Sequence, residues 1–117
     1  MPRKEPGEPY SRLDSNEAAT HYNDDDVVFV DVRRIDEYAE GHIKGALFIT
    51  VDDILARYDE LPQDKRLMFI CAAGVRSGLA CEMAAAMGYD TEKLYNVEDG
   101  TGAWIQNGHP TSRGSEL

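Results

Sequence analysis

The stretch of sequence that decides the fold lies near the middle of the chain and reads Leu67-Met68-Phe69-Ile70-Cys71-Ala72-Ala73-Gly74-Val75-Arg76-Ser77. Residues 67–70 form a continuous apolar run, which is typical of a strand that is buried on both faces of a parallel sheet. After the small residues 72–74, apolar side chains recur at helical spacing up to a stop at Gly88: Leu79, Ala80, Met83, Ala84 and Met87. A buried strand that leads straight into a helix is the basic unit of α/β domains.

Strands and helices alternate on both sides of this segment. The sequence predicts further strands at residues 27–30, 46–49 and 94–97, and further helices at residues 14–22, 35–40, 51–61 and 100–105. Asp14 and Glu17 have the spacing of a capping box at the start of the first helix. The helix at residues 51–61 rests on an apolar stripe of Val51, Ile54, Leu55 and Tyr58. This alternation predicts an α/β domain around a mainly parallel sheet.

The length of the chain is that of one domain. Its 117 residues, 42% of them hydrophobic, suffice for a single ordinary core. Residues 1–9 are rich in Pro, Gly and charge, so we expect a flexible lead there, and we expect a flexible tail at residues 111–117. The folded domain is expected over residues 10–110, with Trp104 as an anchor of its core.

The composition argues against several classes of function. The formal net charge is −10, with 22 acidic against 12 basic residues, whereas binding to nucleic acid or to an anionic membrane needs a basic surface. No apolar run approaches the roughly 20 residues of a membrane span, and the N-terminus lacks the apolar stretch of a signal peptide, so we expect a cytoplasmic protein. Two cysteines are too few for a disulfide scaffold, and the three histidines are too far apart to give a metal-binding spacing.

The segment after the apolar run carries the features of a nucleophile with an anion-binding site. Ligands of open α/β sheets bind at the carboxyl ends of the strands, where Cys71 is expected. The start of the following helix favours an anion, the small residues 72–74 allow backbone N–H groups to curl inward as a nest, and Arg76 adds a positive charge. Each feature favours the nucleophilic thiolate. The alternative is that Cys71 is only a small core residue.

From Tyr10 to Pro110 the chain resembles a single rhodanese domain, because four signatures occur in that family's order. They are Val30-Asp31-Val32-Arg33 at the end of a strand; Glu37-Tyr38 followed by Gly41-His42-Ile43, Gly45 and Ala46; the loop from Cys71 to Ser77 with Gly74 and Arg76; and Gly100 to Trp104 followed by Gly108-His109-Pro110. The resemblance implies a central parallel sheet with helices on both faces. It also implies that Cys71 is the active-site cysteine.

The resemblance further implies a sulfurtransferase that needs neither a metal nor an organic cofactor. Cys71 would attack a sulfane sulfur donor, such as thiosulfate or a persulfide, and become a persulfide itself. The outer sulfur would pass to a thiophilic acceptor, which is cyanide in an assay and a thiol or a partner protein in the cell. The persulfide and the donor oxyanion would be held by the backbone amides of Ala72, Ala73, Gly74, Val75, Arg76 and Ser77. Arg76 would also bind and orient the anion.

Two features of the loop discriminate between possible activities. Four residues separate Cys71 from Arg76, whereas the related cell-cycle phosphatases and tyrosine phosphatases use five, so sulfur transfer is favoured over a phosphatase or an arsenate reductase. The uncharged residues Ala72, Ala73 and Val75 stand where some rhodaneses carry an extra Lys or Arg. They favour a persulfide donor over thiosulfate. They also keep open a second hypothesis, a persulfide carrier or regulatory protein-binding module with little small-molecule turnover.

Residues outside the loop are candidates for supporting roles. Asp31 and Arg33 could be catalytic, but the resemblance favours a pair that braces the loops. His42 could shuttle protons, but a His after Gly in a turn more often hydrogen-bonds its neighbours, and we favour that interpretation. Cys81 could form a disulfide with an oxidised Cys71, but a helical Cys among Ala and Met is usually a packing residue. The physiological donor, the acceptor and the oligomeric state cannot be predicted from the sequence.

Overall fold

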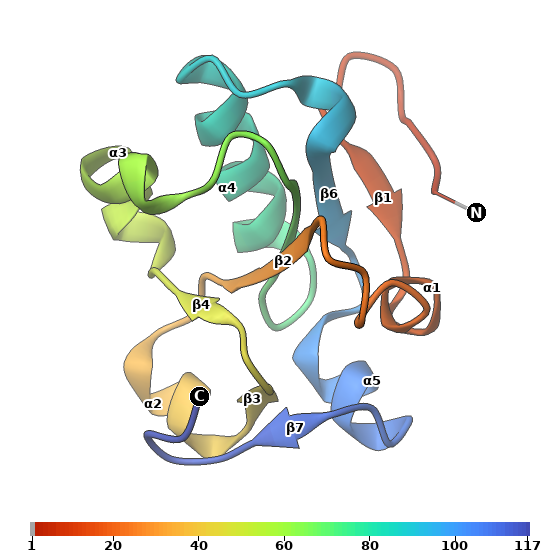
Figure 1. Cartoon of the computed structure of the whole chain (residues 1–117), viewed down its shortest axis with the longest axis vertical. Coiled ribbons are helices and arrows are strands. Elements are labelled where there is room, and N and C mark those ends of the chain that lie inside the picture. The colour runs from red at the N-terminus through yellow and green to blue at the C-terminus, as the bar shows by residue number, and fades with distance from the viewer. Residues whose placement is uncertain (1) are drawn as a thin grey trace.

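A five-stranded parallel sheet forms the centre of the structure, a computed structural model that describes residues 2–117. The strand order is β1-β6-β5-β2-β4, and every neighbouring pair is parallel. The strands are β1 (Ser11–Leu13), β2 (Val27–Asp31), β4 (Leu47–Phe48), β5 (Arg66–Ile70) and β6 (Leu94–Val97). The predicted α/β class and parallel central sheet are therefore confirmed (Figure 1).

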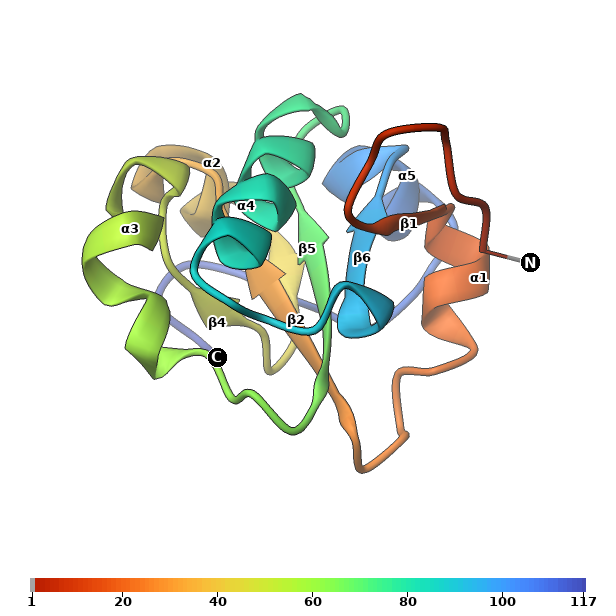
Figure 2. The same cartoon turned by 90° about the horizontal axis from the view of Figure 1, so that it is seen from above.

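Helices cover both faces of this sheet (Figure 2). One face carries α3 (Ile54–Arg57) and α4 (Val75–Ala86), and the other carries α1 (Ser15–Ala19) and α5 (Gly100–Gln106). Strand β5 separates the two cores, because Leu67 and Phe69 belong to the cluster under α3 and α4, whereas Met68 and Ile70 belong to the cluster around Trp104. Successive side chains of a strand point to opposite faces, so the continuous apolar run of β5 is buried on both sides.

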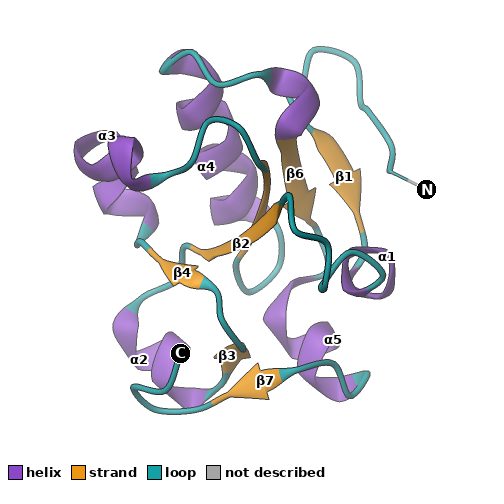
Figure 3. Cartoon of the chain, viewed as in Figure 1, coloured by secondary structure: helices purple, strands orange, loops and turns teal. Residues whose placement is uncertain are grey.

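A small second sheet lies below the β4 edge, beside α2 (Ile35–Glu40) (Figure 3). It consists of β3 (His42–Ile43) and β7 (Thr111–Ser112), which pair antiparallel. Strand β7 begins one residue after the expected domain end at residue 110, and in the expected lead Arg3 forms a β-bridge with Arg12. The flexibility of residues 1–9 and 111–117 stays a prediction.

Residues 51–61 do not form the continuous helix that their apolar stripe predicts. A 3-10 turn η1 (Val51–Asp53), helix α3 and a second 3-10 turn η2 (Tyr58–Glu60) follow one another. Ile54 is fully buried, but Leu55 is 53% exposed. A 3-10 turn has about 3.0 residues per turn instead of 3.6, so its side chains leave the face that α-helical spacing predicts.

Helix α4 buries only part of the predicted face, since Ala80 and Ala84 are buried and Met83 is partly buried. Leu79 and Met87 are exposed, whereas the buried residues of this helix are small: Ser77, Gly78, Ala80, Cys81 and Ala84. Small side chains allow the helix to lie close against β5 and β6, and the larger residues are left at its margins. A short 3-10 turn, η3 (Thr91–Lys93), precedes β6.

The remaining predicted elements are present, although α1 and β4 are shorter than predicted. The capping box of α1 is confirmed, because the Glu17 amide donates to the Asp14 carboxylate at 2.8 Å and the Asp14 amide donates to the Glu17 carboxylate at 2.9 Å. Trp104 is fully buried, as predicted, and its ring lies 5.3 Å from that of Phe29. Within residues 2–117, no helix has both the length and the apolar character to cross a membrane.

Candidate active site

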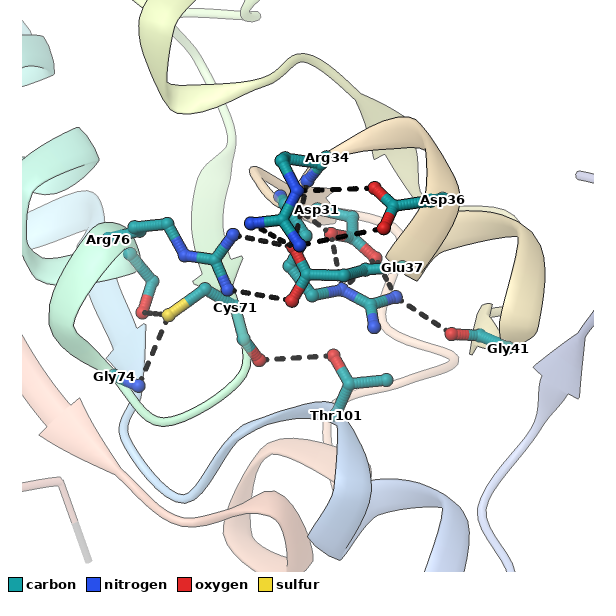
Figure 4. Close-up of polar contacts among 11 residues, drawn as sticks. Asp31, Arg34, Asp36, Glu37, Gly41, Cys71, Gly74, Arg76 and Thr101 are labelled. Carbon is teal, nitrogen blue, oxygen red and sulfur yellow. Dashed lines mark hydrogen bonds and ion pairs between the residues drawn. The ribbon is translucent and has the colours of Figure 1, made fainter.

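Cys71 stands at the end of β5, where the chain curls into the loop that starts α4 (Figure 4). Its side chain is almost fully buried. The Gly74 amide donates to Sγ at 3.2 Å, and the Ser77 hydroxyl oxygen also lies 3.2 Å from Sγ. The carbonyl oxygen of Cys71 accepts from the amide and the hydroxyl of Thr101, at 2.9 and 3.1 Å. The loop therefore surrounds the sulfur, and the start of α5 holds its backbone.

Two glycines allow the loop to take this shape. Gly74 has a φ of +89°, and a Cβ there would lie 2.6 Å from the carbonyl oxygen of Glu98. Gly100 has a φ of +82°, and a Cβ there would lie only 1.9 Å from the carbonyl oxygen of Ala72. Side chains at these positions would push apart the Cys71 loop and the turn that follows β6.

A buried polar network ties the loop to β6. The Ser77 hydroxyl donates to Oδ1 of Asn96 at 2.6 Å, and Nδ2 of Asn96 donates to the Gly74 carbonyl at 3.0 Å. Asn96 is almost fully buried, so both ends of its amide are satisfied by the loop. Ser77 was predicted as a binding residue, but Asn96 was not predicted. The signal that could have found it is a polar residue inside an otherwise apolar strand.

The pKa of the Cys71 thiol is lowered from its ordinary value. Burial raises this pKa and is the largest single influence, but the hydrogen bond with the Ser77 hydroxyl and those from the amides of Ser77, Ala73 and Gly74 together outweigh burial. The direction agrees with the prediction, and the amides of Ala73 and Gly74 contribute to it. Ala72, Ala73 and Val75 are exposed, which leaves the rim of the loop uncharged.

The guanidinium of Arg76 is paired with a carboxylate that the sequence did not predict. Its Nη1 and Nη2 donate to the two carboxylate oxygens of Glu37 at 2.7 and 2.9 Å (Figure 4). This ion pair joins the start of α4 to α2, and it lowers the pKa of Glu37 to about 2. The positive charge expected beside Cys71 is therefore matched by a carboxylate that is 39 residues away in the sequence.

A second cation, which the sequence did not predict, lies near this pair. Arg34, the N-cap residue of α2, has its Nη1 3.7 Å from a Glu37 carboxylate oxygen and donates from Nε to Asp36 at 3.2 Å. Its side chain is 69% exposed. Arg34 follows the Asp31-Val32-Arg33 signature directly in the sequence, so its position could have been inferred from the strand end.

Asp31 and Arg33 form a buried ion pair, in agreement with the favoured interpretation. Nε of Arg33 donates to Oδ1 of Asp31 at 3.0 Å, and Nη2 donates to Oδ2 at 2.7 Å. The same Nη2 donates to the carbonyl of Gly41 at 2.7 Å. Because Arg33 precedes α2 and Gly41 follows it, the pair connects both ends of the helix that carries Glu37. Its bracing role in function stays a prediction.

His42 lies in β3 and is fully buried. Its Nδ1 is 2.8 Å from the carbonyl of Tyr38, its Nε2 hydrogen-bonds the carbonyl of Glu116, and its ring stacks on Tyr38 with centroids 3.6 Å apart. These partners belong to α2 and to the C-terminal segment, and none belongs to the Cys71 loop. The contacts agree with the favoured interpretation of His42 as a residue that hydrogen-bonds its neighbours.

Cys81 lies in α4 and is fully buried. Its thiol donates to the carbonyl of Tyr95 at 3.4 Å, and burial raises its pKa well above the ordinary value. A protonated thiol with an internal partner is a poor nucleophile. The favoured interpretation of Cys81 as a packing residue agrees with this environment.

A cavity of about 450 Å³ lies against the outer side of the loop. Its lining includes the loop residues 73–75 together with Glu8, Tyr10, Arg12, Gly78, Leu79, Glu82 and Glu98. Three carboxylates and one guanidinium make this neighbourhood acidic. Among residues 2–117, the structure groups no three His, Cys, Asp or Glu side chains in a way that could hold a metal ion.

The chain is similar in sequence to known sulfurtransferases and matches one protein family over most of its length. The profile of the family described as "Rhodanese-like domain" matches residues 14–107. A "Putative sulfurtransferase YtwF" of Bacillus subtilis is 38% identical over 81 residues, which cover 69% of this chain and 76% of that protein. A "Sulfurtransferase" of Allochromatium vinosum is 33% identical over 101 residues, which cover 86% of this chain and 92% of that protein.

A further relative and a solved structure extend the comparison. A "Putative sulfur carrier protein YrkF" of Bacillus subtilis is 32% identical over 82 residues, which cover 70% of this chain and 43% of that longer protein. The crystal structure of a rhodanese-like domain protein from Staphylococcus aureus superposes with a TM-score of 0.72 at 32% identity, and the match covers 80% of this chain and 89% of that one.

Proposed function

This chain belongs to the rhodanese-like domain family and is a rhodanese-type sulfurtransferase, and from that premise we propose that Cys71 carries the transferred sulfur as a persulfide. The observation that carries the proposal is the environment of its Sγ. The sulfur accepts a hydrogen bond from the Gly74 amide and lies beside the Ser77 hydroxyl, and the pKa of the thiol is lowered. These groups stabilise a thiolate, which is the nucleophilic form of the residue.

In the first half of the proposed cycle, the Cys71 thiolate attacks the outer sulfur of a donor. With thiosulfate, a new S–S bond forms to Cys71, the bond between the two donor sulfurs breaks, and sulfite leaves with the electron pair of that bond. With a low-molecular-weight persulfide, the leaving group is a thiolate instead. In both cases the enzyme is left as a Cys71 persulfide anion, whose charge faces the amides of the loop.

In the second half, a nucleophilic acceptor attacks the outer sulfur of the persulfide. With an acceptor thiolate, the acceptor becomes a persulfide and the Cys71 thiolate is restored. With cyanide, thiocyanate leaves and the same thiolate is restored. The sulfur moves as a neutral atom between two anions, so the cycle needs no oxidant, reductant or proton beyond those of donor and acceptor.

The exposed rim of the loop favours an acceptor thiol that is larger than cyanide. Val75, in the loop itself, is 80% exposed. An exposed apolar side chain beside the nucleophile suits contact with a protein or a bulky thiol. The name of the sulfur-carrier relative YrkF agrees with a second candidate function, in which this chain mainly relays persulfide sulfur between proteins and turns over small donors slowly.

Substitution of the two cysteines tests the proposal. We expect Cys71→Ser to abolish both thiocyanate formation and the gain of one sulfur atom in the protein mass after incubation with a donor. Cys81→Ser, the matched control, should retain most of both signals, because Cys81 is buried and has a raised pKa. Equal loss in the two variants would overturn the single-nucleophile mechanism. Hydrolysis of para-nitrophenyl phosphate at a rate above sulfur transfer would favour a phosphatase instead.

A further inference from the structure

We propose that Glu37 is a specificity-determining residue that competes with anionic sulfur donors for Arg76. Its carboxylate occupies both terminal nitrogens of the guanidinium that would otherwise bind the oxyanion of a donor such as thiosulfate. The inference rests on the proposed function, because it concerns which donors deliver sulfur to Cys71. It adds a residue outside the loop that selects among them.

The Glu37 carboxylate binds the Arg76 guanidinium in the way that the oxyanion of a donor would bind it. Two parallel N–H···O contacts of 2.7 and 2.9 Å use both oxygens of the carboxylate. A guanidinium offers this paired fork to carboxylates, phosphates and sulfonates alike. An incoming sulfonate group must therefore displace Glu37 or accept a weaker contact with Arg76.

Glu37 is held in place from its own helix. One of its carboxylate oxygens also accepts the Arg34 backbone N–H at 3.2 Å. The helix that carries it is tied at both ends by the buried Asp31–Arg33 pair and the contact of Arg33 with Gly41. The Glu37 and Arg76 side chains are only 20% and 28% exposed, so water screens their attraction less than it would screen a surface pair. Displacement by a freely diffusing anion is correspondingly costly.

The charges around the entrance add up to a neutral site. Arg34 and Arg76 supply two positive charges, and Asp36 and Glu37 supply two negative charges that contact them. The neighbouring cavity is acidic. A thiosulfate dianion therefore meets no net attraction at the entrance. A persulfide donor carries no sulfonate group. It does not need the paired nitrogens of Arg76 and is therefore not at the same disadvantage.

Replacement of Glu37 by Gln tests this inference. Gln has nearly the same shape but no charge, so Glu37→Gln should free Arg76 for donor oxyanions. We expect kcat/KM for thiosulfate to rise about tenfold, which corresponds to about 1.4 kcal/mol, and kcat/KM for cysteine hydropersulfide to change less than about twofold. The control is Asp36→Asn, which removes a negative charge one residue away that contacts Arg34 and not Arg76. Asp36→Asn changes the net charge of the entrance by the same unit but leaves both Arg76 nitrogens paired with Glu37, so it should raise kcat/KM for thiosulfate clearly less than Glu37→Gln does.

A binding measurement separates competition for Arg76 from a merely structural role. In a Cys71→Ser background, calorimetric titration with sulfite should show tighter binding when Glu37 is replaced by Gln. If Glu37→Gln does not fold, Glu37→Asp serves in its place, since its shorter side chain cannot reach both nitrogens without strain. It should shift the donor ratio in the same direction by a smaller factor.

The possible outcomes are distinct. The inference would be overturned if Glu37→Gln left the ratio of kcat/KM for the two donors unchanged. It would also be overturned if kcat/KM fell equally for both donors and sulfite bound no more tightly. Either result would show that Glu37 only supports the loop. That result would leave the proposed function standing as long as Cys71 still gains sulfur. Failure of the wild-type protein to load sulfur onto Cys71 from either donor would instead overturn the proposed function itself.

Discussion

Cys71 and Cys81 are ten residues apart and both are buried, yet their pKa values are shifted in opposite directions. Burial raises the pKa of both thiols. At Cys71 the amides of a curled loop and a hydroxyl face the sulfur, and they outweigh burial. At Cys81 burial is the largest cause of the raised pKa, and the negative charges of Glu82 and Glu8 raise it further. The hydrogen-bond donors that surround Cys71 therefore set the nucleophile apart from Cys81.

Removal of the Ser77 hydroxyl should raise the pKa of Cys71. The Ser77 side chain is the strongest of the influences that lower this pKa, so Ser77→Ala should shift the pH dependence of iodoacetamide labelling upward. In the wild-type protein Cys71 should titrate below the reference value of about 8.5. Identical profiles for the two proteins would contradict the role of the hydroxyl, and a wild-type value above the reference would contradict the lowered pKa.

The individual residues of the site were predictable to different extents. Cys71 and its loop follow from local sequence, because strand, small residues and helix start are contiguous. The partner of Arg76 could not be predicted in the same way, since it depends on how α2 lies against α4. Asn96 is the opposite case, because a polar residue in a buried strand must find partners, and only the fold shows that they are Ser77 and Gly74.

At the scale of elements, a side chain at position 100 of α5 should destabilise the fold, whereas a side chain at position 102 should not. Gly100→Ala should destabilise the fold by roughly 3 kcal/mol or more, since a Cβ would overlap the Ala72 carbonyl and the backbone is left-handed there. Gly102→Ala is the matched control in the same helix, where a Cβ meets nothing within 4 Å. It should be neutral or stabilising by up to about 1 kcal/mol.

Urea unfolding of both variants measures these differences. A Gly100→Ala protein as stable as the wild type would mean that the Cys71 loop and α5 can separate without cost. In that case the contact of Thr101 with Cys71 could not be regarded as a rigid support for the nucleophile.

The ion pair that joins α2 to α4 should make stability depend on pH in the acid range. The pKa of Glu37 is about 2 in the folded protein and 4.5 ordinarily, so its contribution is complete above pH 4.5 and is lost as the pH falls towards 2. The contribution is at most about 3 kcal/mol, and partial exposure reduces it. Unfolding free energies measured between pH 7 and pH 2 should therefore fall more steeply for the wild type than for Glu37→Gln. Parallel curves would contradict the lowered pKa.

The element boundaries show where periodicity fails as a guide. The stripe in residues 51–61 has helical spacing, but two 3-10 turns interrupt the helix and Leu55 faces solvent. In α4 the predicted stripe is only partly buried, because the small residues Ala80 and Ala84 face the sheet whereas the larger Leu79 and Met87 are exposed. Hydrophobicity alone does not reveal how closely a helix approaches its sheet, and that distance decides which side chains fit.

At the scale of the whole molecule, the net charge of −10 should oppose the arrival of dianionic donors. We expect kcat/KM for thiosulfate to rise modestly as ionic strength increases from about 0.01 M to 0.1 M, over which the Debye length falls from about 30 Å to about 10 Å. Steady-state kinetics at constant pH measure this effect. A rate that only falls with added salt would show that local attraction at Arg34 and Arg76 outweighs the overall charge.

The fold as a whole was predictable in class but not in all of its pairings. Alternating strands and helices predict an α/β domain with a parallel sheet, because parallel strands need long crossover connections. The strand order β1-β6-β5-β2-β4 places the first strand beside the last strand of the main sheet, a long-range pairing that no local pattern encodes. The same is true of β3 and β7, since two-residue strands carry too little pattern to be recognised.

The close approach of Gly100 to the Cys71 loop also bears on the evolution of this scaffold. The carbonyls of Cys71 and Ala72 would lie 2.9 and 1.9 Å from a Cβ at position 100, so the loop has no room to expand towards α5. A lineage that lengthened the loop, as a change towards phosphate chemistry requires, would have to move it outward or reshape the turn after β6 in the same step. We therefore expect the loop length and the residue at position 100 to covary among descendants of this domain.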